Sequence, residues 1–197
     1  MSGWTNGALP DQTSSGFSDA FVRKYDSHGN ELWTRQFGNG WTVIAFGISV
    51  DASGVYVGGR TSGALPGQTS TGFDDAFVRK YDANGNVLWT RQLGTTKIDR
   101  AFEVSVDASG VYVVGETDGA LPGQTSSGGF QAFVVKLSVV SALELLQRLI
   151  ADVVALNLQQ GISNSLDSKL DAAVEALDDL KENNDVAAIN ALQAFIN

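Results

Sequence analysis

The sequence is dominated by an internal repeat of 56 residues. The tetrapeptide Gly-Ala-Leu-Pro occurs three times at this constant spacing, first at Gly7. Residues 5–60 and 61–116 align at the same offset without gaps and are identical at 38 of 56 positions. A third, partial copy remains recognisable over 117–137. Such a chain must fold as about two and a half similar units placed side by side, each contacting its neighbours.

Each unit carries the pattern of four short strands. Phe46, Ile48 and Val50 alternate with smaller or polar residues, which is the period of a strand with one buried face. Three more strands are expected over 55–57, 76–81 and 87–93. Glycine is abundant, with 22 residues in 197, as tight turns require. Four antiparallel strands in a unit of this length are typical of a propeller blade.

Two kinds of connection join these strands. Residues 51–54 and 82–85 are short Asp-x-x-Gly turns, in which aspartate caps the turn and glycine accepts a positive φ. Residues 61–75 and 94–100 are longer and polar. Alternate connections of an antiparallel meander emerge at the same end of the sheet. We therefore expect the long loops to share one face and the tight turns to share the other.

The motifs DAFVRKYDANGNVLWTRQLG and AFEVSVDASGVYVVGET resemble the β-propeller repeat of secreted bacterial proteins, the seven-bladed propeller type repeat. The resemblance covers residues 1 to about 137. It implies a mainly β fold, with four-stranded antiparallel blades forming a partial β-propeller over 1–138, and an extracellular or cell-surface location. In the third copy, Phe130 and Gln131 replace Asp74 and Asp75, as expected of a blade at the end of an array.

The number of repeats raises the question of ring closure. Propellers commonly need four to eight blades, so we expect either that several copies assemble into a ring or that an open arc self-associates through its blade edges. The first residues lie inside a repeat unit and contain no signal peptide, which suggests a piece of a longer protein.

The residue pattern changes at about position 138 from period two to the helical period. Ser141 and Glu144 form a capping box, and amphipathic stripes follow. They predict a C-terminal α-helical part, a small three-helix bundle over 139–197. The stretch ALNLQQGISNSLDSKLDAAVEAL resembles the FIMAH-type helical module found at the C-terminal ends of secreted bacterial hydrolases and repeat proteins.

Composition excludes several classes of function. The chain has no cysteine, which rules out disulfides, zinc knuckles and thiol catalysis. Its net charge is −9, which disfavours nucleic acid as a partner. No apolar stretch is long enough for membrane insertion.

The residues for catalysis or metal binding are also missing. His28 is the single histidine, and Asn84 occupies the equivalent position, so this site requires a turn former rather than an imidazole. Because the chain has no other histidine, a Ser-His-Asp triad cannot form. The Asp-x-Asn-Gly turns resemble the start of a calcium loop but lack its other carboxylates. We expect no enzymatic activity, no metal and no cofactor.

One cluster of differences between the two full units points to a contact surface. Six of the 18 differences lie together, at 39–44 and 95–100, where Lys97 replaces Trp41. Asp74-Asp75 is expected as an exposed carboxylate pair beside these loops. The candidate ligand contacts are Trp41, Asp74, Asp75, Lys97, Asp99 and Arg100. Neutral drift in an unconstrained loop is the alternative.

Two repeated residue types have structural explanations beside the functional ones. Asp19 and its equivalent Asp75 are expected to accept hydrogen bonds from the neighbouring loop backbone. The equivalent Trp33 and Trp89 are expected to pack between blades, with sugar stacking as the alternative.

The sequence thus predicts a non-catalytic extracellular binding or scaffold segment. Its blades would present the long-loop face to a protein or carbohydrate partner. The alternatives are an accessory region of a secreted hydrolase or lyase, whose catalytic domain lies outside this chain, and a purely structural stalk.

Overall fold

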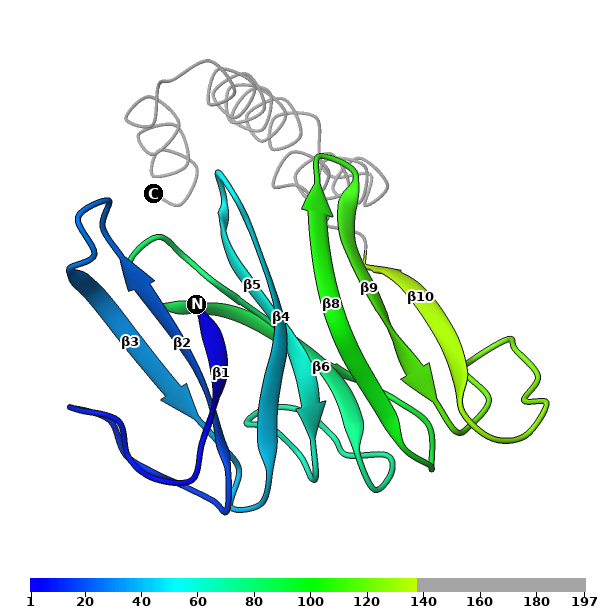
Figure 1. Ribbon diagram of the computed structural model, residues 1–197. Coiled ribbons are helices and arrows are strands. Elements are labelled where there is room, and N and C mark those ends of the chain that lie inside the picture. The colour runs from blue at the N-terminus through cyan, green and yellow to red at the C-terminus, as the bar shows by residue number, and fades with distance from the viewer. Residues whose placement is uncertain (138–197) are drawn as a thin grey trace, which may run out of the picture. The chain divides into compact units, whose positions relative to one another are not determined.

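The chain divides into two compact units, Met1–Ser138 and Val139–Asn197. The computed structural model describes residues 1–137, which form ten β-strands and no helix (Figure 1). The predicted helical bundle and its FIMAH resemblance concern residues outside this described part. Among the described residues, no helix is long and apolar enough to cross a membrane.

The strands form three antiparallel sheets. The first contains β1 (Ser2–Thr5), β2 (Asp19–Tyr25) and β3 (Glu31–Phe37). The second contains β4 (Val43–Asp51), β5 (Gly54–Thr61), β6 (Asp75–Tyr81) and β7 (Val87–Leu93). The third contains β8 (Asp99–Asp107), β9 (Gly110–Thr117) and β10 (Gln131–Leu137). Strands adjacent in sequence are adjacent in space, so each sheet is a meander, and the whole is consistent with part of a β-propeller.

Equivalent strands lie 56 positions apart, down to their irregularities. The bulge between Ala45 and Gly47 in the β4–β5 ladder recurs between Ala101 and Glu103 in the β8–β9 ladder. The bulge interrupts the alternation of side chains along β4. Phe46 and Val50, which the sequence pattern placed on a buried face, are instead exposed, and the buried side chains are those of Val43 and Ala45.

The sheets pack face to face around two hydrophobic cores. β4 contacts β1 and β2, and β8 contacts β4, β5 and β6. Strand β6 is buried along its whole length and serves both cores, because successive side chains point to opposite faces. Phe77 lies in the core between the first and second sheets. Ala76 and Val78 lie in the core between the second and third.

The repeated tryptophans lie at these sheet contacts, as predicted. The indole Nε1 of Trp33 donates to the carbonyl of Ala83, at 3.0 Å, on the turn of the second sheet. A Cβ on Gly85 would lie 2.8 Å from the Trp33 ring, and Gly85 has a φ of +79°, so both the contact and the backbone conformation favour glycine here. Trp89 packs against the second core, with its ring 6.0 Å from that of Tyr56. Trp33 therefore joins the first sheet to the second directly, and Trp89 packs against the core between the second and third sheets.

Candidate binding face

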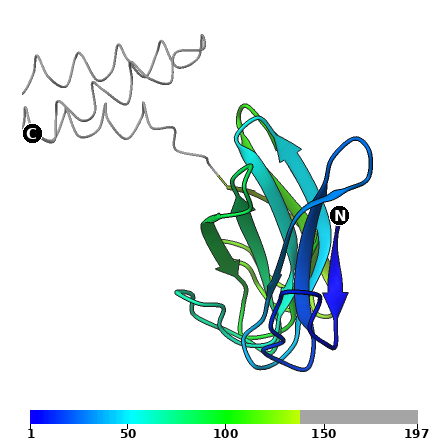
Figure 2. The same cartoon turned by 90° about the vertical axis from the view of Figure 1, so that its left-hand side faces the viewer.

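The long connections lie at the same end of all three sheets, the lower end in Figures 1 and 2. We call this end the loop face; it comprises residues 6–18, 38–42, 62–74, 94–98 and 118–130. Backbone hydrogen bonds join neighbouring loops: Phe73 N donates to Lys97 O at 3.1 Å, and Asp99 N donates to Asp74 O at 2.8 Å. The expectation that the long loops share one face is confirmed.

Each complete long loop is held by a buried aspartate and a glutamine. Asp75 accepts from Thr71 N and Thr71 Oγ1, both at 2.8 Å, and from Gln92 Nε2 at 2.7 Å. Gln92 also accepts from Leu65 N at 3.0 Å and donates to Gly63 O at 3.2 Å. We call Gln92 and its contacts the glutamine clamp. The predicted hydrogen bond from the loop backbone to Asp75 is confirmed.

The first sheet repeats this arrangement with Asp19, Ser15 and Gln36. Ser15 N donates to Asp19 at 2.7 Å, and Gln36 Nε2 donates to it at 2.8 Å. Burial alone would raise the pKa of Asp19, but the hydrogen bonds from Gln36 and Ser15 outweigh it and lower the pKa below 3.8. Asp19 is therefore an ionised acceptor at neutral pH.

Asp99 is a further buried carboxylate, at the position that Val43 occupies in the preceding unit. Its Oδ2 accepts from Thr95 N at 2.6 Å and from Thr95 Oγ1 at 2.9 Å. A Cβ on Gly94 would lie 2.5 Å from Asp75 Oδ1 and 2.9 Å from Asp99 Oδ2, so only glycine fits between the two carboxylates. Asp99, like Asp75, holds a connection in place.

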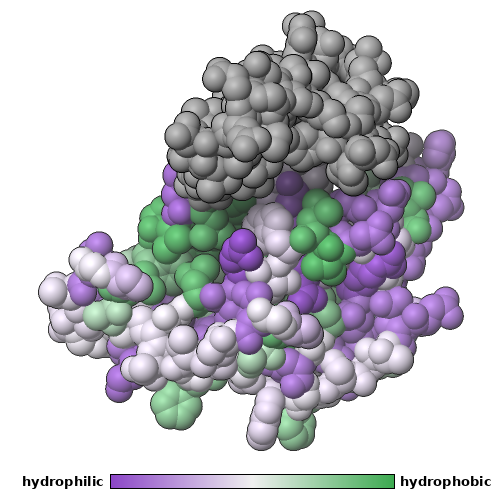
Figure 3. Space-filling view, turned by 180° about the vertical axis from the view of Figure 1, so that it is seen from behind, coloured by the Kyte–Doolittle hydropathy of each residue, from purple (hydrophilic) through white to green (hydrophobic). Residues whose placement is uncertain are grey.

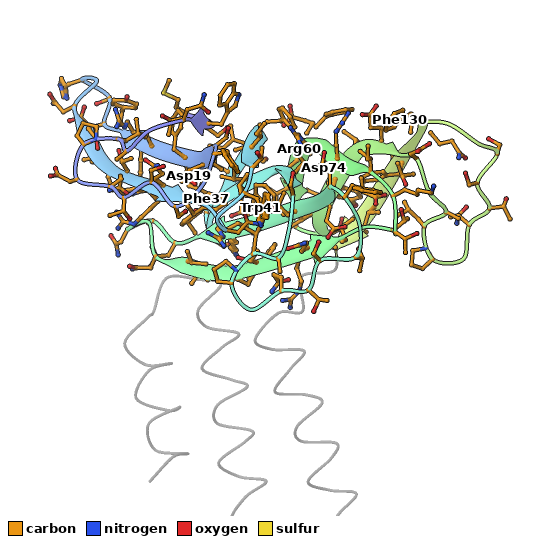
Figure 4. All side chains as sticks on the ribbon, turned by 90° about the horizontal axis from the view of Figure 1, so that it is seen from below. Asp19, Phe37, Trp41, Arg60, Asp74 and Phe130 are labelled. Carbon is orange, nitrogen blue, oxygen red and sulfur yellow. The ribbon has the colours of Figure 1, made fainter. Side chains whose placement is uncertain are left out.

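Four alternating charges cross from the second sheet to the third. Arg60 Nη1 contacts Asp74 Oδ2 at 2.6 Å, Arg100 Nε lies 3.6 Å from the same oxygen, and Arg100 Nη1 contacts Glu116 Oε1 at 2.8 Å. We call this set the ion-pair chain. The guanidinium of Arg100 lies 5.6 Å from the ring centre of Phe130. Figure 4 shows Arg60 and Asp74 side by side, with Phe130 toward one end of the molecule.

The ion-pair chain is specific to this junction. Where the second and third sheets meet through Asp74 and Arg100, the first and second have Ser18 and Ile44 at the equivalent positions. Arg100 belongs to strand β8 and not to a free loop. The replacement of Ile44 by Arg100 therefore occurs at a strand position that contacts two carboxylates, and not in an unconstrained loop.

Four large aromatic side chains are exposed on the loop face. Phe17 and Phe73, which are equivalent, are 71% and 77% exposed, and Trp41 is 61% exposed. The rings of Phe17 and Trp41 lie 6.2 Å apart and are tilted by 43°. Phe130 is also exposed. We call these four residues the aromatic row. Figure 3 shows the margin of this face, at the bottom of the view, as mostly pale with single green side chains projecting.

The six residues proposed from the sequence thus separate into two groups. Trp41 and Lys97 are exposed on the loop face. Asp74, Asp75 and Asp99 are buried, and Arg100 is half-buried in the ion-pair chain. The expectation of an exposed carboxylate pair at 74–75 is wrong, because both side chains are held by hydrogen bonds within the fold.

The sequence reasoning overlooked the phenylalanines of the aromatic row. Their signal was the dipeptide Gly-Phe, which recurs 56 residues apart at Phe17 and Phe73. Its meaning depends on topology, because Phe77, only four residues later, is fully buried. Within residues 1–137, no group of three or more His, Cys, Asp or Glu side chains is arranged to hold a metal ion.

The chain is similar to short stretches of much longer proteins. It is 34% identical over 136 residues to the regulatory protein FlaEY of Caulobacter vibrioides, which covers 62% of this chain and 14% of that protein. It is 28% identical over 112 residues to an uncharacterized WD repeat-containing protein of Acanthamoeba polyphaga mimivirus, which covers 51% of this chain and 8% of that protein. The chain therefore spans only a small part of either relative. No protein-family model matches the chain.

Proposed function

We propose that residues 1–137 are a non-catalytic, extracellular binding segment of the β-propeller type, which contacts a partner protein through the aromatic row. The exposure of Phe17, Trp41 and Phe73 on one face carries this proposal. Three large aromatic groups at the ends of glycine-rich loops are costly to leave in water, and aromatic residues are enriched among those that dominate binding energy.

The charges of the loop face support an apolar contact. Asp74 and Arg100 already contact each other and further charged partners, and Asp75 and Asp99 are buried. A partner that paired with these charged side chains would have to break their existing ion pairs and hydrogen bonds. The same partner can cover the aromatic row without breaking any interaction within the protein. The row thus supplies the affinity, and the hydrogen-bonded loops beneath it supply a rigid support.

A protein fits this surface better than a sugar does. The rings of Phe17 and Trp41 are tilted by 43° to each other, so together they form no flat platform on which a sugar ring could stack. The resemblance to secreted repeats and the similarity to a WD repeat-containing protein, a class built from propeller blades, also support a binding module. An accessory role beside a secreted hydrolase or lyase, with a glycan on Trp41, is the alternative, and the FIMAH-like stretch favours it.

The test compares two triple variants of the full chain. Phe17→Ala, Trp41→Ala and Phe73→Ala together remove most of the aromatic row. Val50→Ala, Val87→Ala and Leu88→Ala remove exposed apolar groups at the tight-turn end and serve as the control.

Wild type and both variants are immobilised, exposed to the extracellular protein fraction of the source cells, and analysed by mass spectrometry after chemical cross-linking. We expect proteins cross-linked at the loop face of the wild type and the control variant, and their loss from the aromatic variant. Retention of the same proteins by the aromatic variant would refute the proposal. A glycan-array signal that depends on Trp41 would favour the accessory role instead.

A further inference from the structure

The outer edge of β10 lines a groove that has no counterpart in the other two sheets. It has a volume of about 770 Å³ and is lined by β10, by Leu93 and Gly94, and by residues of the 118–130 loop. Val22 and Val78, in the equivalent strands β2 and β6, are 1% and 0% exposed, whereas Val134 is 70% exposed. In the first and second sheets, the strand that follows in the chain, β3 or β7, pairs with the corresponding edge of β2 or β6. We call this place the edge groove.

The loop side of the edge groove keeps the groups that hold such a strand. Residues 119–126 are identical to 63–70, which hold Gln92 of β7. In the second sheet, Gln92 Oε1 accepts from Leu65 N at 3.0 Å, and Gln92 N donates to Gln68 Oε1 at 3.0 Å. The corresponding groups are the backbone N–H of Leu121 and the side-chain amide of Gln124. Within residues 1–137, neither has a hydrogen-bond partner.

The strand side of the edge groove differs from its equivalents. In the first and second sheets, an arginine of β2 or β6 donates to a threonine of the next strand, β3 or β7. Arg23 Nε donates to Thr34 Oγ1 at 2.6 Å, and Arg79 Nε donates to Thr90 Oγ1 at 2.8 Å. Val135 takes the place of this arginine in β10. A threonine opposite Val135 would be buried without its donor, and an unsatisfied buried hydroxyl is costly.

We propose that the edge groove binds an extended segment of a separate polypeptide, which adds to β10 as an antiparallel fourth strand. The ladder of β6 with β7 defines the register: glutamine opposite Phe133, an apolar residue opposite Ala132, and tryptophan opposite Lys136. The residue opposite Val135 is apolar. Pairing of a foreign strand with an exposed sheet edge is an established mode of peptide recognition.

The requirement opposite Val135 distinguishes this occupant from a second copy of the chain. Among the ten strands of residues 1–137, the two that carry the remaining pattern are β3 and β7, and both have threonine at this position, Thr34 and Thr90. Both are already paired within their own sheets. The edge groove lies along β10 and is distinct from the aromatic row, so this proposal does not rest on the proposed function.

The test uses synthetic peptides titrated into the full chain. The parent peptide has the sequence of residues 82–94, and a second carries Thr90→Val. We expect saturable binding of one peptide per chain, with the Thr90→Val peptide about tenfold tighter than the parent, because no hydroxyl is then left unsatisfied. Adding Gln92→Ala to the Thr90→Val peptide should weaken binding by at least about tenfold, because the backbone N–H of Leu121 then loses the side-chain oxygen that takes the place of the Gln92 Oε1 acceptor of Leu65.

Protein variants and hydrogen exchange locate the bound peptide. Gln124→Ala in the chain should weaken binding, whereas Gln68→Ala, the matched change in the filled second sheet, should leave the peptide affinity unchanged. The amides of 131–137 should become protected on binding. The proposal is overturned if neither peptide binds, if the parent binds as tightly as the Thr90→Val peptide, or if Gln68→Ala and Gln124→Ala act alike. Dimers in light scattering whose β10 amides are already protected would instead assign the edge groove to a second copy.

Discussion

The glutamine clamp makes a quantitative prediction about stability. Replacing Gln92 by alanine removes hydrogen bonds to Leu65 N, Gly63 O and Asp75 in one step. Leu65 and Asp75 are buried, so water cannot easily replace the lost partner. A neutral hydrogen bond contributes about 1 kcal/mol and one to a charged group about 1.5 kcal/mol or more. We therefore expect Gln92→Ala to lower the free energy of unfolding by about 3 kcal/mol.

Gln36→Ala provides the internal control, because Gln36 makes the same three contacts in the first sheet, to Leu9, Gly7 and Asp19. Gly7 is exposed and Leu9 is half-buried, so water can take over part of what is lost. We expect a loss of about 2 kcal/mol or less for this variant.

Urea unfolding followed by tryptophan fluorescence measures both losses from the shift in midpoint, provided that the slope of the transition is unchanged. A loss below about 1 kcal/mol for Gln92→Ala would contradict the clamp as a stabilising element. A loss for Gln36→Ala as large as that for Gln92→Ala would contradict the role of burial.

Three further predictions concern single residues. Burial raises the pKa of Tyr81 from 10.0 to about 12, so its contribution to stability is present below pH 10 and is lost as the pH rises toward 12; alkaline unfolding of Tyr81→Phe should lack this loss of about 2–3 kcal/mol. Gly59→Ala places a Cβ on the carbonyl oxygen of Ile44 and should cost about 3 kcal/mol or more in urea unfolding, whereas Gly7→Ala, in open space, should cost little. Asp74→Ala leaves Arg60 without its 2.6 Å partner, and the resulting loss of about 1–2 kcal/mol should shrink in high salt; a loss that is independent of salt would contradict an electrostatic origin.

The repeat explains why so much of the fold was predictable from sequence. A constant spacing of 56 residues predicted equivalent strands, the alternation of short and long connections and the face that the long loops share. The buried face of β4 was missed because the bulge between Ala45 and Gly47 breaks the two-residue period on which the prediction depended. Local irregularity of this kind has no distinct sequence signal.

The candidate site was less predictable, because its residues are defined by contacts between sheets. Asp74 is charged and lies in a loop, which predicted exposure, yet Arg60 and Ser62 hold it inside the fold. Phe73 is apolar, a residue type that is usually buried, yet it is among the most exposed large hydrophobic residues described. Whether a loop residue points into the protein or into water depends on which neighbouring loop lies beside it.

The ion-pair chain constrains how an array of such units can lengthen. Units that are identical at 38 of 56 positions are ready substrates for unequal recombination of their coding sequences. A tandem duplication of 61–116 would set a second Asp74 beside Glu116, in the place that Arg60 fills now. Two carboxylates would then face each other at the new joint, so we expect such a duplicate to lose the stabilisation that Arg60 now gives Asp74. A cation introduced beside them would restore it.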